Sequence, residues 1–153
     1  MKKDVVSIQP DATLLEAAQL LSKKHIGTLP VVDSHGKLVG LTSLRAIVRL
    51  FMPDFVQLVG DVDFVQDFGA IETLRPEDFE RAETTTVADI MDEAVSVEDD
   101  CELARALVMM ITHELPDLPV VRKGKLVGIA SRVDIGRAFL ENWLAQTHSP
   151  KSK

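Results

Sequence analysis

The sequence predicts an α/β (α+β) fold built from two copies of a small βαββα unit. Three observations carry this prediction: a long internal repeat, a helix pattern upstream of it, and short β-branched runs beside glycine turns. Residues 29–46 and 118–134 both contain Leu-Pro-Val-Val, then Gly-Lys-Leu-Val-Gly, then a serine three positions later. The copies are offset by 89 residues before the hairpin loop and by 88 after it. Self-similarity at a nearly fixed offset indicates duplicated structural units.

Each copy contains a predicted amphipathic helix upstream of the shared run. Apolar residues with the i, i+3, i+4, i+7 spacing of one helix face occur in both copies: Leu14, Ala17, Ala18 and Leu21, then Leu103, Ala106, Leu107 and Met110. Thr13 and Glu16 have the spacing of a capping box, so the first helix is expected to begin at about Thr13. It is expected to end near His25, with Gly27 beyond it as a breaker.

The other predicted elements of each unit are short strands and a closing helix. In the first copy we expect a strand at residues 5–8, a hairpin of residues 29–32 and 38–42, and a helix from Ser43 to about residue 51. The closing helix of the second copy is expected to begin at Ser131 and to continue past Trp143. One unit has too few strands to cover its apolar face, so the two copies are expected to pack together.

Composition excludes several classes of protein. A net charge of −7 and a pI of about 5.0 argue against a nucleic-acid groove. No apolar run approaches membrane-spanning length, so no membrane contact is expected, and a cytoplasmic location is predicted. The single cysteine, Cys101, rules out an internal disulfide framework. The sequence contains no nucleophile–base pair, zinc-type cluster or phosphate-binding glycine loop, so neither an enzyme nor a catalytic cofactor is predicted.

The predicted organisation has two repeats joined by a segment of different character. The first repeat is expected at residues 1–52, the second at 87–146, the connection at 53–86 and a flexible tail at 147–153. Residues 53–83 hold nine carboxylates, two arginines and four of the six phenylalanines, which is too apolar for a disordered acidic linker. We interpret them as an ordered connection whose aromatic residues pack on the repeats. The alternative is a docking surface for a partner or a second subunit.

The start of each copy shows a second, weaker correspondence. Met1-Lys2-Lys3 stands where Met91-Asp92-Glu93 does if one residue of slip is allowed. The stretch Val87-Ala-Asp-Ile-Met91 has no counterpart before Asp4. One interpretation is that the chain is a fragment that begins inside the first repeat.

These two copies resemble a pair of cystathionine-β-synthase-type (CBS) domains over nearly the whole chain outside residues 53–83. The lead-in Val87-x-Asp-Ile-Met91 is also similar to the start of a CBS repeat. The resemblance implies two βαββα repeats packed with pseudo-two-fold symmetry, relating residues 29–43 to 118–131. It implies a regulatory module whose clefts hold adenine nucleotides or, in some members, S-adenosylmethionine-type ligands. It also implies a homodimer that acts on another protein.

The resemblance assigns a ligand motif of glycine, two apolar residues, serine or threonine, two further residues and aspartate. The second copy matches it fully at Gly128-Ile-Ala-Ser131-Arg-Val-Asp134, with Asp134 expected on the ribose hydroxyls and Ser131 beside ribose and phosphate. The first copy, Gly40-Leu-Thr-Ser43-Leu-Arg-Ala46, lacks the aspartate. We therefore expect one strong site and one weaker site per chain.

The same resemblance places the adenine pocket on the first strand and on the residues that lead into the Pro-Val-Val strand. The stronger site is expected to comprise Ser131, Asp134, Arg132, Val95, Ser96, Val97, Leu115, Pro116, Asp117, Leu118 and Pro119. The weaker site is expected to comprise Ser43, Arg45, Ile26, Gly27, Thr28, Leu29 and Pro30. Each set is drawn from a single repeat.

The chemistry of these residues agrees with ligand contact but leaves another role open. Ser131 opens a helix, where a hydroxyl and free N–H groups favour an anion. Asp134 lies on the same turn, where a carboxylate can accept both hydroxyls of a ribose. Ser131-x-x-Asp134 is also close to a capping box, in which each side chain only satisfies a helix-end amide. Arg45 and Arg132 have the reach to contact phosphates, or they are only solvated at the surface.

Two functions from different classes remain open at this stage. The first is a regulatory module that senses AMP, ADP or ATP in the cleft between the repeats, and the intact Asp134 favours it. The second is a ligand-free module that dimerises and docks a protein partner through its helices and acidic segment, and Ala46 favours it. Leu140, Trp143 and Leu144 extend the last helix, and their exposure would favour self-association. The alternative is that Trp143 folds back onto residues 53–83.

Overall fold

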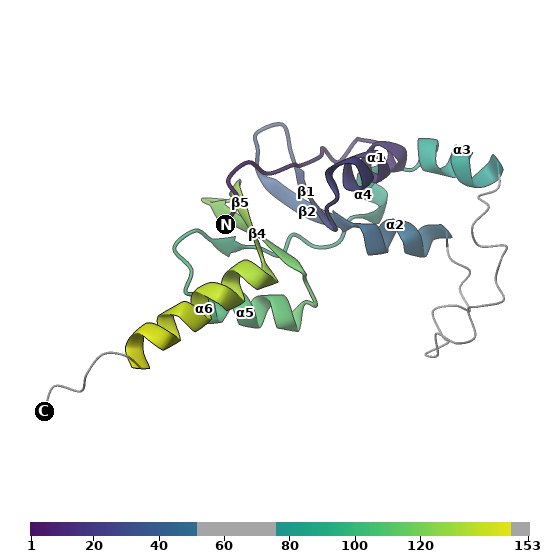
Figure 1. Ribbon diagram of the computed structural model, residues 1–153. Helices are drawn as coiled ribbons and strands as arrows, with labels where there is room; N and C mark the ends of the chain where they lie inside the picture. The colour runs from purple at the N-terminus through teal and green to yellow at the C-terminus, as the bar shows by residue number, and fades with distance from the viewer. Residues whose placement is uncertain (52–75, 148–153) are drawn as a thin grey trace, which may run out of the picture.

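The computed structural model describes residues 1–51 and 76–147, which form two repeats that share a helix, a hairpin and a closing helix in that order (Figure 1). The first repeat contains α1 (Leu14–Lys24), β1 (Thr28–Val32), β2 (Leu38–Ser43) and α2 (Leu44–Phe51). The second contains β3 (Val97–Glu98), α5 (Leu103–Thr112), β4 (Asp117–Arg122), β5 (Lys125–Ser131) and α6 (Arg132–Thr147). Between them lie α3 (Pro76–Thr84) and α4 (Val87–Ile90). The predicted α+β fold of two repeats is therefore confirmed.

The shared run folds into an antiparallel hairpin in both copies, with the same register. Pro30 of β1 lies opposite Leu41 of β2, and Pro119 of β4 lies opposite Ile129 of β5. The turns contain Gly36 and Gly124, whose φ angles of 77° and 78° lie in the left-handed region that favours glycine. The matched register follows from the matched alternation of apolar residues, because a slip of one residue would turn the buried face outward.

Local interactions mark both ends of helix α1. The capping box predicted for α1 is present: Glu16 N–H donates to Thr13 Oγ1 at 3.2 Å, and Thr13 N–H donates to Glu16 Oε2 at 2.8 Å. The prediction that Gly27 breaks this helix is wrong. His25 takes the left-handed conformation, with φ of 52°, and its N–H donates to the last turn of α1. Glu114 has the same φ after α5.

The predicted strand at residues 5–8 is reduced to a single bridge. Only Ile8 pairs, in parallel with Val31, through Ile8 N–H to Pro30 O at 3.0 Å and Val32 N–H to Ile8 O at 2.9 Å. Lys2 is paired instead with Ile129 of β5, in the other repeat. The residues between Lys2 and Ile8 therefore cross from one sheet to the other, so they cannot add a continuous strand to either.

The repeats join through their hairpins and share part of the core. Leu38 N–H donates to Gly124 O at 3.0 Å, and Leu126 N–H donates to Gly36 O at 3.1 Å. Each repeat has its own apolar core beneath its helices, centred on Leu14, Leu21, Leu29 and Val31 in the first and on Ala106, Met110, Leu118 and Val120 in the second. A third cluster, which we call the inter-repeat cluster, consists of Leu38, Leu41 and Val121.

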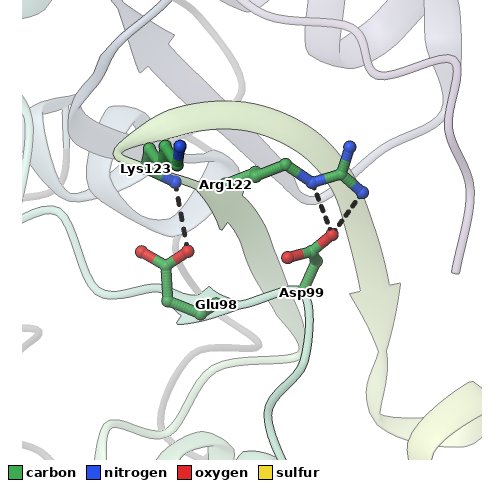
Figure 2. Close-up of polar contacts among 4 residues, drawn as sticks. All are labelled: Glu98, Asp99, Arg122 and Lys123. Atoms are coloured by element: carbon green, nitrogen blue, oxygen red, sulfur yellow. Dashed lines mark hydrogen bonds and ion pairs between the residues drawn. The ribbon is translucent and has the colours of Figure 1, made fainter.

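The second hairpin is also tied to Glu98 of β3 and to Asp99, the residue that follows this strand. Arg122 donates from Nε (2.7 Å) and from Nη2 to Oδ2 of Asp99, and Lys123 N–H donates to Glu98 Oε2 at 3.1 Å (Figure 2). In the first repeat, Asp33 instead caps its own turn, accepting from the N–H groups of residues 35 and 37 at 2.9 Å each. Arg122 holds the pKa of the Asp99 carboxyl below its ordinary value.

The connecting segment is described only from Pro76 onward. Helix α3 packs on α1 and buries Ala82 in the first core. Phe79 is 55% exposed, which contradicts the expectation that this aromatic residue packs on a repeat. Phe55, Phe64 and Phe68 lie outside the described residues. Among the helices of residues 1–51 and 76–147, none is both long and apolar enough to cross a lipid bilayer.

Candidate functional site

Two clefts open between the repeats, and each is lined by both of them. The larger, the Ser43 cleft, has a volume of about 980 Å³. Its lining includes Thr28, Ser43, Arg45, Ala46, Arg49, Asp92, Glu93, Val95, His113, Glu114, Leu115 and Pro116. The smaller, the Asp134 cleft, has a volume of about 420 Å³. Its lining includes Lys2, Asp4, Val5, Val6, Lys24, His25, Ile26, Gly27, Thr28, Asp117, Ile129, Ser131 and Asp134.

The structure groups the predicted site residues differently from the two sets, because some members of each set line the other cleft. Val95, Leu115 and Pro116 were expected with Ser131, but they line the Ser43 cleft. Ile26 was expected with Ser43, but it lines the Asp134 cleft, and Gly27 and Thr28 line both clefts. Asp117 and Ser131 do share the Asp134 cleft, and Arg45 lies in the Ser43 cleft, as predicted.

Backbone pairing between the repeats explains this exchange. Asp92 N–H donates to Leu41 O at 2.7 Å and Leu41 N–H donates to Asp92 O at 3.1 Å. Lys2 N–H donates to Ile129 O at 2.9 Å and Ile129 N–H donates to Lys2 O at 3.0 Å. The segments that lead into the repeats, which contain Lys2 in the first and Asp92 in the second and are called lead-ins below, therefore each pair with the second hairpin strand of the other repeat. Val87, also in the lead-in of the second repeat, is fully buried in the first core.

Several predicted contact residues line neither cleft. Leu29, Pro30, Leu118 and Pro119 are fully buried in the hairpin strands, where Leu29 and Leu118 belong to the two cores. Ser96 and Val97 line a separate hollow beside Cys101 and Arg105. Arg132, expected near phosphate, lines neither cleft, and its Nη2 donates to Leu115 O at 3.0 Å. These positions were carried over by motif spacing, which does not reveal which face of a strand or helix turns toward the cleft.

Ser131 and Asp134 form the capping box that sequence spacing left open as an alternative. Asp134 N–H donates to Ser131 Oγ at 3.1 Å, and Ser131 N–H donates to Asp134 Oδ2 at 3.3 Å. The Ser131 hydroxyl, followed by its backbone N–H, lowers the pKa of the exposed Asp134 carboxyl, so this group is charged at neutral pH. In the first repeat, Ala46 N–H donates to Ser43 Oγ at 3.1 Å, and there is no carboxylate to complete the box.

The inner wall of the Asp134 cleft contains a second polar group. Asp117 is partly buried, and this burial raises the pKa of its carboxyl group. The charge of Asp134 raises it further, whereas the Thr28 hydroxyl and the Lys2 ammonium act in the opposite direction. Thr28 is only 3% exposed, and its Oγ1 makes no hydrogen bond of normal geometry, although it lies close enough to influence Asp117. A buried hydroxyl without a good partner is unusual in a core.

Charged residues from the lead-ins were missed by the sequence prediction. Lys2 and Asp4 line the Asp134 cleft, and Asp92 and Glu93 line the Ser43 cleft. The sequence did contain a signal for them, the alignment of Met1-Lys2-Lys3 with Met91-Asp92-Glu93. In the structure Lys2 and Asp92 pair with equivalent residues of β5 and β2. In the Ser43 cleft, Arg45 Nη1 lies 3.6 Å from Glu114 Oε2, between two exposed side chains. No cluster of three or more His, Cys, Asp or Glu side chains suited to a metal occurs within residues 1–51 and 76–147.

Comparisons with known proteins agree with this architecture. A family model described as CBS domain matches residues 1–53 and 87–141. The chloroplastic CBS domain-containing protein CBSX1 of Arabidopsis thaliana is 32% identical over 151 residues, covering 92% of this chain and 61% of that protein. The crystal structure of the CBS-pair protein CBSX2 from Arabidopsis thaliana has a TM-score of 0.70 at 25% identity, covering 94% of this chain and 93% of that one. The crystal structure of CBSX2 in complex with AMP has a TM-score of 0.64 at 26% identity, covering 92% and 90%.

Proposed function

This chain belongs to the CBS domain family, and from that premise we propose that it is a regulatory module that binds an adenine nucleotide between its two repeats. The ligand would be of the AMP, ADP or ATP type, and the module would bind it without catalysing a reaction. The observation that carries the proposal is the Asp134 cleft, where a charged carboxylate, a helix N-terminus and a buried hydroxyl line one hollow. The similarity to CBSX2, which was crystallised with AMP, supports this ligand class.

In the proposed complex, Asp134 exchanges a local hydrogen bond for the ligand. Its Oδ2 accepts from Ser131 N–H at a long 3.3 Å. A ribose would offer two hydroxyl donors in place of that one amide. The Ser131 N–H and hydroxyl would then face the phosphate at the start of α6, where free backbone N–H groups favour an anion.

The Ser43 cleft is proposed as the weaker site, because Ala46 occupies the position of Asp134. A carboxylate that accepts two hydroxyl hydrogen bonds contributes about 2–3 kcal/mol, since bonds to charged groups are worth about 1.5–3 kcal/mol each at most. Its loss corresponds to a dissociation constant about 30- to 150-fold higher. We therefore expect one tight site per chain.

A titration of three variants tests the assignment. Calorimetry of the parent chain with AMP, ADP, ATP and S-adenosylmethionine is expected to show one tight site for an adenine nucleotide. Asp134→Ala is expected to lose most of that affinity, whereas Asp100→Ala, which removes an exposed carboxylate outside both clefts, retains it. Ala46→Asp is expected to strengthen the second site. The site assignment fails if Asp134→Ala binds every nucleotide as well as the parent chain does, and the function fails if the parent binds none.

The second candidate function, a dimerising interaction module, is favoured by one surface. Apolar side chains are exposed along α5 and α6: Val108, Ile111, Phe139, Leu140, Trp143 and Leu144. Contiguous exposed apolar patches mark interaction sites. We propose that a second copy of the chain covers this surface, giving a homodimer. Regulation of a separate protein partner and a cytoplasmic location also belong to the proposal.

A further inference from the structure

Equivalent positions in the two clefts carry opposite charges. Lys2 pairs with Ile129, and Asp92 pairs with Leu41, each through two backbone hydrogen bonds. Ile129 and Leu41 are equivalent residues of the repeats, since each lies opposite the proline of its own hairpin. Lys2 and Asp92 therefore occupy the same place in their clefts, and the side chain that reaches the ligand space is a cation in one and an anion in the other.

The backbone of Lys2 is held firmly on the strand that leads to Ser131. Besides the two hydrogen bonds to Ile129, the preceding side chain covers Gly128 so closely that a β-carbon there would lie 2.5 Å from Met1 Sδ. Figure 1 shows the N-terminus beside β5. Because both bonds fix the backbone, only the rotamers of the Lys2 side chain remain to position its ammonium group at the cleft.

The Lys2 ammonium acts on both acidic groups of the cleft. Its charge lowers the pKa of Asp117 and, together with the N-terminal ammonium of Met1, that of Asp134. The titratable groups that line the cleft are three carboxylates, two ammonium groups and one imidazole: Asp4, Asp117, Asp134, Lys2, Lys24 and His25. Without Lys2, the positive charges near the three carboxylates would be those of Lys24 and of the N-terminal ammonium, and a phosphate would meet a net negative charge.

We propose that Lys2 determines the preference of the Asp134 cleft for phosphorylated over unphosphorylated adenine nucleosides. The inference rests on the proposed function, because it presupposes that an adenine nucleoside enters this cleft. Before a nucleotide binds, the ammonium offsets the negative charges of Asp117 and Asp134. When a nucleotide binds, the same ammonium is the point charge that the phosphate meets, and a lysine is well suited to that role.

Paired titrations with AMP and adenosine test the proposal. The parent chain is expected to bind AMP more tightly than adenosine. Lys2→Met is expected to weaken AMP binding by about 5- to 20-fold, the size of one charge-assisted contact at a partly screened site, and to leave adenosine binding within about 2-fold. Lys3→Met is the matched control, since it removes the same charge from the next residue, which lines neither cleft. Lys2→Arg is expected to keep the preference for AMP.

Three outcomes would overturn the inference in distinguishable ways. If Lys2→Met binds AMP as the parent chain does, the phosphate preference has another source and the proposed function stands. If Lys3→Met weakens AMP binding as much as Lys2→Met, the effect belongs to net charge and not to the cleft. If the parent chain binds neither AMP nor adenosine, the inference and the proposed function fail together. Melting temperatures of all variants separate loss of binding from loss of folding.

Discussion

Gly40 lies directly beneath the side chain of Met91, so that a β-carbon at residue 40 would lie 2.5 Å from Sδ and 3.0 Å from Cγ. Asp92 O would also be only 3.1 Å away. This close approach allows the lead-in of the second repeat to hydrogen-bond to β2 of the first. The glycine is therefore required by contact between the repeats, since its φ angle is not in the left-handed region.

Gly40→Ala is expected to destabilise the fold by about 1–3 kcal/mol, the usual range for overpacking. Met91→Ala in the same chain is expected to recover part of the loss, because it removes the atoms that the new methyl group meets. Gly27→Ala is the matched control, since a β-carbon at residue 27 meets nothing within 4 Å. Chemical denaturation measures the stability of all three variants. Equal midpoints for Gly40→Ala and Gly27→Ala would contradict the packing argument.

Asp117→Asn is expected to stabilise the chain at neutral pH. Burial raises the pKa of this carboxyl in the folded state, so the folded state binds the proton more tightly than the unfolded state. The stability contributed by Asp117 is present at low pH and is lost as pH rises from its ordinary pKa through the raised value. Melting curves at pH about 7 and about 3 check this, with the gain confined to the higher pH.

Asp134→Asn, in the same cleft, is expected to change the stability at neutral pH in the opposite direction to Asp117→Asn. The Ser131 hydroxyl and N–H lower the pKa of this carboxyl, so its contribution is present above the ordinary pKa and is lost as pH falls through the lowered value. The variant is expected to be less stable than the parent chain at neutral pH and similar to it in acid. Equal shifts for the two asparagine variants at neutral pH would show that the two carboxyl environments do not differ as described.

The ion pair between Asp99 and Arg122 is expected to contribute to the acid sensitivity of the second hairpin (Figure 2). Because Arg122 lowers the pKa of Asp99, the stabilisation is complete above the ordinary pKa and disappears as pH falls through the lowered value. Asp99→Asn is expected to flatten the pH dependence of the melting temperature, and Asp100→Asn to leave it steep. A parallel response of the two variants would contradict the assignment. The pair is solvent-exposed, so added salt is expected to weaken it.

Trp143→Glu is expected to abolish self-association. Trp143 is 56% exposed on α6, next to a hollow formed with the first residues of α5, and a buried tryptophan is a common anchor of interfaces. Light scattering of the parent chain at micromolar concentration is expected to give twice the 16.8 kDa of one chain. Phe79→Glu is the matched control, because Phe79 is equally exposed on α3. A parent mass near 16.8 kDa would contradict the dimer.

Local signals in the sequence were sufficient for most elements of the fold. The Thr13 capping box and the glycine turns of the hairpins depend on residues within four positions of one another, and they are present where predicted. The strand predicted at residues 5–8 is reduced to one bridge because Lys2 pairs with Ile129, which lies 127 residues away in the sequence. No local pattern records such a pairing. It is set by how the repeats pack together.

The candidate site shows the same division. Ser131 and Asp134 were placed together correctly, since their spacing on one helix turn determines it. Which lead-in lies beside which motif depends on the crossed packing of the repeats, so residues such as Val95 and Ile26 line the cleft opposite to the one expected. The missing carboxylate at Ala46 could likewise be read from the sequence. The charges that Lys2 and Asp92 bring into the clefts could be assigned only once the strand pairing was known.

The crossed lead-ins and the joined hairpin turns hold the two repeats together through contacts that lie outside the connection. The inter-repeat cluster, the Leu38–Gly124 and Leu126–Gly36 hydrogen bonds and the two lead-in pairings all lie outside residues 52–75. A chain cut by a protease within residues 52–75 is therefore expected to elute from a sizing column as an uncut chain does, and to melt in one transition. Either half made alone would expose Leu38 and Leu41, or Val121, and would tend to capture the missing half from another molecule.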